Sequence, residues 1–91
     1  MKGEIKKSVL RRLKIAGGQI EGLQRMVEGD KYCVDIITQS AAIREALSGV
    51  ERLMLENHLS TNVVQQMKSG KSKQATNEII KIYRLAQKKN N

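Results

Sequence analysis

The chain has 91 residues and a net charge of +8, which suits one small domain (residues 1–91) with an acidic partner such as nucleic acid. The single cysteine excludes an intrachain disulfide framework and a zinc site built from several thiolates. The lack of tryptophan and phenylalanine limits the size of the hydrophobic core. No apolar run approaches the roughly 18 residues of a membrane span, so we expect a cytoplasmic protein without a membrane partner.

The first predicted helix carries one apolar stripe. Its residues are separated by steps of three and four, which is the spacing of one helical face. They are Val9, Leu13, Ala16, Ile20, Leu23 and Val27. Gly29-Asp30 ends this helix, and Asp30 is suited to cap the next one.

A second helix is predicted over about residues 32–67, which is long for a globular protein. Ser69-Gly70 ends it, and a third helix begins at Ser72 or Thr76. We therefore predict an all-α chain of three helices. Because little other chain is available to cover the apolar stripes, we expect an antiparallel four-helix-bundle dimer, with the third helix completing a dimer of dimers.

Positive charge gathers at the two ends of the chain. Residues 2–14 have a net charge of +5 and residues 68–91 of +6, whereas residues 15–67 have −3. Basic segments gain affinity for DNA because each neutralised phosphate releases counterions. An alternative is a helical scaffold or interaction protein whose basic ends keep it soluble without binding DNA.

Cys33 and His58 are the two residues suited to bind a soft metal ion. They are 25 residues apart on one predicted helix, or roughly 37 Å at 1.5 Å per residue. If two copies of that helix pack antiparallel about a two-fold axis near residues 44–46, Cys33 of one subunit faces His58 of the other. The alternative is an unrelated pair, a small buried cysteine and a surface histidine.

Several motifs together resemble the copper-sensitive operon repressor (CsoR) family. They are DKYCVD at 30–35, Gln39, RLMLENHL at 52–59, RLKI at 12–15, Gly18-Gln19 and Gly22. The resemblance implies all-α dimers, paired into tetramers, that repress transcription and leave DNA when an inducer binds. It therefore implies a regulator and not an enzyme.

The resemblance also implies a set of functional residues. In the copper sensors of that family, Cu(I) lies between subunits on a cysteine of one protomer and on a histidine and a second cysteine of the other. The first two match Cys33 and His58, whereas Asn62 stands at the position of the second cysteine. Tyr32 and Glu78 match residues that surround the metal-bound histidine. The DNA-binding positions, with their near neighbours, are Arg11, Arg12, Lys14, Gln19 and Arg52.

Asn62 leaves the identity of the inducer open at this point. An amide oxygen is a hard, poor ligand for Cu(I), which prefers thiolate and imidazole. Cu(I) is the inducer we expect, held by Cys33 and His58. The alternative is a sensor of formaldehyde or another electrophile that reacts at Cys33, because that subgroup of the family shares the cysteine–histidine pair without the further thiol.

Overall fold

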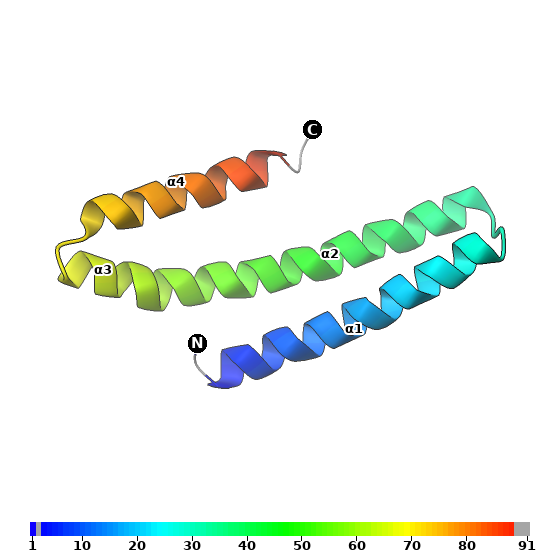
Figure 1. Ribbon diagram of the computed structural model, residues 1–91, viewed down its shortest axis with the longest axis horizontal. Helices are drawn as coiled ribbons and strands as arrows, with labels where there is room; N and C mark the ends of the chain where they lie inside the picture. The colour runs from blue at the N-terminus through cyan, green and yellow to red at the C-terminus, as the bar shows by residue number, and fades with distance from the viewer. Residues whose placement is uncertain (2, 89–91) are drawn as a thin grey trace. The chain divides into compact units, whose positions relative to one another are not determined.

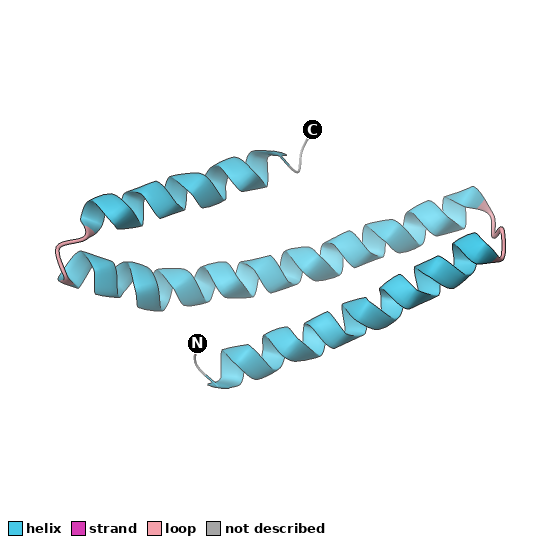
Figure 2. Cartoon of the chain, in the orientation of Figure 1, coloured by secondary structure: helices cyan, strands magenta, loops and turns pink. Residues whose placement is uncertain are grey.

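The computed structural model describes residues 1 and 3–88, and every regular element in that part of the chain is helical. The elements are α1 (Gly3–Glu28), α2 (Cys33–His58), a π-helical turn η1 (Leu59–Val63), α3 (Val64–Lys68) and α4 (Ser72–Lys88) (Figure 1; Figure 2). Lys2 and Lys89, two of the basic residues near the ends, lie outside the described residues. The predicted all-α class is confirmed. None of the described helices is long and apolar enough to cross a membrane.

The chain divides into two compact units, the first ending at Glu56 and the second beginning at Asn57. In the first unit, α1 and α2 run antiparallel as a helical hairpin (Figure 1). The side chains buried between them are Val9 and Ala16 of α1 and Ile43 of α2. The single domain expected over residues 1–91 stays a prediction.

The end of α1 differs from the expectation in one respect. Asp30 adopts a left-handed conformation with φ of 50°, which aspartate tolerates better than most residues. This conformation lets the backbone N–H groups of Asp30 and Lys31 donate to the carbonyls of Val27 (3.1 Å) and Met26 (3.0 Å). Asp30 thus terminates α1. The prediction that it caps α2 is wrong, because α2 begins three residues later at Cys33.

The second predicted helix is interrupted where the sequence suggested a continuous one. The π-helical turn η1 follows His58 directly and separates α2 from α3. Within it, the hydroxyls of Thr61 and Ser60 donate to the carbonyl of Asn57 at 2.6 and 3.3 Å. Hydroxyls that bond a carbonyl three or four residues back compete with the regular helical ladder. An apolar repeat does not reveal this competition, so the sequence pattern missed the turn.

The second unit is a shorter helical hairpin in which α3 packs against α4. Gly70, with φ of 76°, allows the tight reversal between them. The N–H of Lys71 donates to the carbonyl of Gln66 at 2.7 Å and closes the turn. Ala75 is buried in this unit. Helix α4 begins at Ser72, which is one of the two predicted start positions.

Much of the predicted apolar stripe of α1 remains uncovered in the single chain. Val9 and Ala16 are buried, but Leu13, Ile20 and Val27 are 41%, 49% and 55% exposed. One chain therefore leaves large aliphatic side chains in helical register along its surface.

Candidate metal and nucleic-acid sites

His58 and Glu78 meet within the second unit. Nε2 of His58, at the end of α2, lies 3.0 Å from Oε2 of Glu78 in α4. Nε2 is buried and has no hydrogen-bond partner of good geometry among the described residues. The contact with Glu78 is therefore short but poorly aligned for a hydrogen bond. In a neutral imidazole whose Nε2 carries the proton toward a carboxylate, Nδ1 keeps its lone pair. Nδ1 is thus the atom with which His58 is able to bind a metal ion.

Two glutamine side chains hold the carboxylate of Glu78. Nε2 of Gln66, in α3, donates to both oxygens at 3.3 and 3.2 Å, and Nε2 of Gln74 donates to Oε1 at 3.2 Å. Neither glutamine was predicted from the sequence. Gln74 was detectable because it precedes Glu78 by four residues on one helix. Gln66 was not, because its contact depends on the reversal of the chain at Gly70.

These contacts lower the pKa of Glu78 below its ordinary value of 4.5. The side-chain hydrogen bond from Gln66 contributes most, followed by that from Gln74; burial opposes them, and the charge of His58 adds a smaller lowering effect. Hydrogen bonds donated to a carboxylate stabilise its ionised form. Glu78 is therefore an anion at neutral pH, positioned to orient His58.

The lowered pKa of Glu78 predicts acid sensitivity of the fold. Because the folded pKa lies below the unfolded one, Glu78 contributes stability above pH 4.5 that is lost as the pH falls through the folded pKa. Glu78→Gln should remove this part of the pH dependence of the free energy of unfolding, measured by urea denaturation between pH 7 and 3. Glu21→Gln, on the exposed surface of α1, is the matched control. An unchanged pH profile in Glu78→Gln would contradict the prediction.

Cys33 and His58 do not meet within one chain. Cys33 is the first residue of α2 and has an exposed free thiol, whereas His58 is the last residue of the same helix. A helix of 26 residues holds its ends roughly 37 Å apart. Tyr32 directly precedes Cys33 and is 69% exposed. No group of three or more histidine, cysteine, aspartate or glutamate side chains suited to a metal occurs within residues 1 and 3–88.

Asn62 lies in the π-helical turn η1, four residues after His58. Its side chain is exposed, and its amide lies 3.0 Å from the hydroxyl of Thr61. A hydroxyl has one proton to donate, and the Thr61 hydroxyl makes its shorter contact with the Asn57 carbonyl. Its hydrogen bond to the Asn62 amide oxygen is therefore weak. π-Helical turns are frequent at functional sites. Asn62 is therefore accessible but chemically unsuited as a strong Cu(I) ligand.

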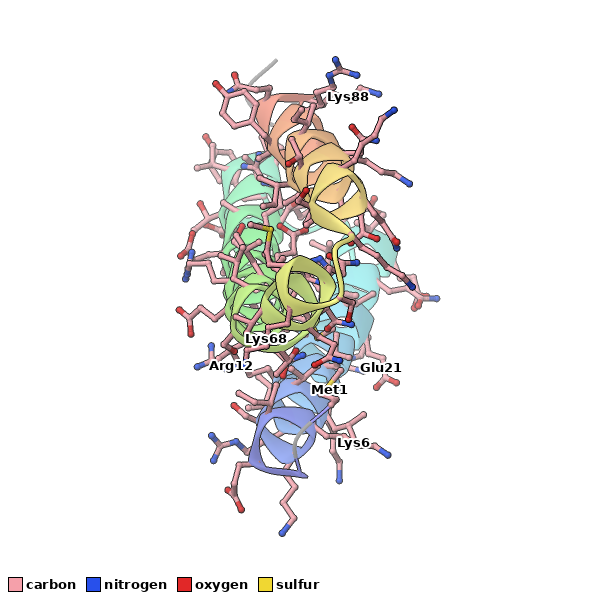
Figure 3. The ribbon with its side chains drawn as sticks, turned by 90° about the vertical axis from the view of Figure 1, so that its left-hand side faces the viewer. Met1, Lys6, Arg12, Glu21, Lys68 and Lys88 are labelled. Carbon is pink, nitrogen blue, oxygen red and sulfur yellow. The ribbon has the colours of Figure 1, made fainter. Side chains whose placement is uncertain are left out.

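The predicted DNA-binding residues lie in the first unit, and two of them converge. The guanidinium groups of Arg12, in α1, and Arg52, in α2, both approach Gly49 of α2. Arg11 and Lys14 are exposed on α1, whereas Gln19 is half-buried with its Oε1 lacking a hydrogen-bond partner among the described residues. Charged side chains of α1 labelled in Figure 3, Arg12 among them, project from the ribbon. The structure thus groups Arg12 with Arg52, which lie 40 residues apart in the sequence.

Comparisons with known proteins all match this chain to metal-sensing or copper-sensing transcriptional repressors. Residues 5–84 match the family described as metal-sensitive transcriptional repressor. The chain is 39% identical over 79 residues to the copper-sensing transcriptional repressor CsoR of Bacillus subtilis (strain 168), a match that covers 87% of this chain and 78% of the relative. It is 40% identical over 75 residues to the copper-sensing transcriptional repressor CsoR of Mycobacterium ulcerans (strain Agy99), covering 82% of this chain and 64% of that relative.

A solved structure shares the fold. The crystal structure of the copper-sensing repressor CsoR with Cu(I) from Geobacillus thermodenitrificans NG80-2 superposes with a TM-score of 0.89 at 32% sequence identity. The match covers 96% of this chain and 91% of that chain. The likeness therefore extends over nearly the whole of both proteins.

Proposed function

The chain belongs to the family of metal-sensitive transcriptional repressors, and from this premise we propose that it is a DNA-binding repressor that leaves its operator when Cu(I) binds between two of its subunits. Its place of action is the cytoplasm, where it binds operator DNA. It regulates transcription and is not an enzyme.

The observation that carries this proposal is the 3.0 Å contact between His58 and Glu78. It leaves Nδ1 of His58 free for a ligand and links that ligand, through one carboxylate, to helix α4. The relatives named copper-sensing support Cu(I) as the ligand. A soft thiolate and an imidazole are the donors that Cu(I) prefers, and Cys33 and His58 supply one of each.

The two donors come from different subunits in this proposal. Cys33 and His58 stand at opposite ends of α2, so one metal ion reaches both only if a second copy of α2 runs antiparallel to the first. Such a dimer contains the cysteine–histidine pair twice. The exposed Asn62 lies near His58 in the chain and contributes at most a weak contact.

We expect the protein to be a homodimer that pairs into a homotetramer. The support is the exposed apolar stripe of α1, because soluble monomers rarely leave large contiguous apolar surfaces in water. Sedimentation equilibrium at micromolar concentration should give a mass of two or four chains. A mass of one chain would contradict the assembly and, with it, a metal site shared between subunits.

Operator DNA is the macromolecular partner. The net charge of +8 and the exposed basic residues of α1 support binding to phosphates. In an assembly of two or four chains, the cluster of Arg11, Arg12, Lys14, Gln19 and Arg52 repeats, so several clusters contact one duplex. Affinity should then fall steeply as the salt concentration rises.

Glu78 is the residue we expect to couple metal binding to DNA release. Glu78→Gln should still bind Cu(I), because Cys33 and His58 remain, with the roughly 10–100-fold loss of affinity that follows removal of a residue supporting a ligand. At saturating Cu(I) it should lose most of the difference in DNA affinity between the free and the Cu(I)-bound protein. Allosteric couplings of this kind are worth about 5-fold to 150-fold in affinity. The measurement is DNA affinity by fluorescence anisotropy with and without Cu(I). Glu28→Gln, at the exposed end of α1, is the control, and full release in Glu78→Gln would contradict the assignment.

One titration tests the function as a whole. The reduced protein, kept anaerobic, is bound to an operator fragment selected from genomic DNA and titrated with Cu(I), and in parallel with formaldehyde. Release by about one Cu(I) per cysteine–histidine pair supports the proposal. Release by formaldehyde but not by Cu(I) would favour the electrophile sensor instead. Failure to select any DNA fragment would favour the helical scaffold.

A further inference from the structure

Gly49 is an unusual residue for the middle of α2. A glycine inside a helix costs roughly 1 kcal/mol of stability relative to alanine, so its presence calls for a compensating contact. Gly49 is buried, and a Cβ atom built on it would lie 2.8 Å from Nη1 of Arg12, which is closer than real Cβ contacts allow. At Gly17 and Gly18 of α1, by contrast, a Cβ would meet nothing within 4 Å. The missing side chain of Gly49 is thus the space that the Arg12 guanidinium occupies.

A second guanidinium approaches the same space. Nη2 of Arg52 lies 3.8 Å from the position that the Cβ of Gly49 would take. The two groups carry like charges, which repel each other. Arg12 forms no ion pair within the described residues, and Arg52 has only a 3.7 Å contact with Glu45, in which both side chains are mostly exposed. Exposed pairs of that kind are weak. Among the described residues, the weak contact with Glu45 therefore offsets only a small part of the charge of these two guanidinium groups.

We propose that Arg12 and Arg52 form one clamp over Gly49 that grips a single phosphate of the DNA backbone, and that Gly49 is the positioning residue whose missing side chain leaves room for the Arg12 guanidinium in the clamp. Guanidinium groups bind phosphate oxygens through paired, charge-assisted hydrogen bonds, which suits two groups converging from different helices. The proposal rests on the proposed DNA-binding function and specifies how that surface binds.

The phosphodiester is favoured over a free phosphate ion by the position of the clamp. Arg12 and Arg52 are exposed on the outside of the hairpin, where one isolated anion is screened by water and salt. Arg11 and Lys14 are also exposed on α1. A polyanion can contact several such groups at once, and each contact adds to its affinity.

Gly49→Ala separates this role from a merely structural one, because stability and binding should change in different directions. The added methyl group raises helix propensity, so the melting temperature should stay the same or rise. The Arg12 guanidinium, the far end of a flexible side chain, must shift away from the added methyl group. Affinity for a mixed-sequence 30-base-pair duplex should therefore fall by up to about tenfold, and the slope of log affinity against log salt should decrease by up to about one. Gly18→Ala, which meets open space, is the matched control and should leave DNA binding unchanged.

A double-mutant cycle with Arg12→Ala completes the test. Arg12→Ala alone should also lower affinity and reduce the salt slope by about one. If Gly49 acts through Arg12, Gly49→Ala has no further effect in the Arg12→Ala protein. An equal effect in both backgrounds, or a changed oligomeric state of Gly49→Ala, would overturn the clamp. Wild-type binding to duplex DNA reports on the proposed function, so a failure of the clamp alone is distinguishable from a failure of both.

Competition with inorganic phosphate tests whether the two arginines bind a free phosphate ion instead of the DNA backbone. At matched ionic strength, millimolar phosphate should displace the duplex no better than chloride does. Displacement by phosphate from the wild-type protein, but not from Arg12→Ala, would assign the two arginines to a free anion and would overturn the clamp as a backbone contact.

Discussion

Replacing Cys33 by serine should abolish Cu(I) binding and Cu(I)-induced release of DNA, while leaving DNA binding itself intact. A thiolate is the strongest soft donor in the chain, and a serine hydroxyl does not replace it for Cu(I). The loss of affinity should exceed the roughly 10–100-fold that follows removal of a residue that merely supports a metal ligand. Because Cys33 is exposed at the first position of α2, the substitution should leave the fold unchanged.

The measurement is competition with a chromogenic Cu(I) chelator under anaerobic, reducing conditions, together with DNA affinity by fluorescence anisotropy. Glu21→Gln, on the exposed surface of α1, is a control that should keep both ligands and bind Cu(I). Tight Cu(I) binding by Cys33→Ser would show that the Cys33 thiolate is not a ligand of the metal. Loss of DNA binding in Cys33→Ser would instead place Cys33 at the DNA surface.

The fold was largely predictable because its helices carry local signals. The regular apolar steps of residues 9–27 and the glycine at 29 locate α1, and Ser69-Gly70 locates the end of α3. The π-helical turn was not predictable in this way, because the hydroxyl of Thr61 that bonds the carbonyl of Asn57 does not alter the apolar repeat. Asp30 was misassigned for a similar reason, since aspartate is common both at helix starts and in left-handed turns.

The candidate sites depend on contacts between helices, which a single sequence does not specify. His58 and Glu78 were paired through the family resemblance, and the structure places them in contact. Gln66 makes the largest contribution to the lowered pKa of Glu78. No sequence pattern indicates this contact, because Gln66 reaches Glu78 only after the chain turns at Gly70. The approach of Arg12 to Gly49 likewise requires the register of α1 against α2.

Replacing Asn62 by cysteine should strengthen Cu(I) binding by more than about tenfold, which corresponds to ~1.4 kcal/mol. Asn62 lies four residues after His58, at the position where the copper sensors that this chain resembles have their second cysteine. Its amide is exposed and engages only the Thr61 hydroxyl among the described residues, so little structure is lost on substitution. A thiolate there would add a third soft donor to Cys33 and His58. Chelator competition measures the gain directly.

Asn62→Ser is the matched control, because it removes the amide without adding a soft donor and should leave Cu(I) affinity near that of the wild-type protein. The pair of variants separates ligand chemistry from an effect of the π-helical turn, since both replace Asn62 with a small side chain. An equal gain in both variants would mean that the amide obstructs the site. No gain in Asn62→Cys would place residue 62 out of reach of the metal, and DNA release by formaldehyde in place of Cu(I) would then identify Cys33 as an electrophile sensor.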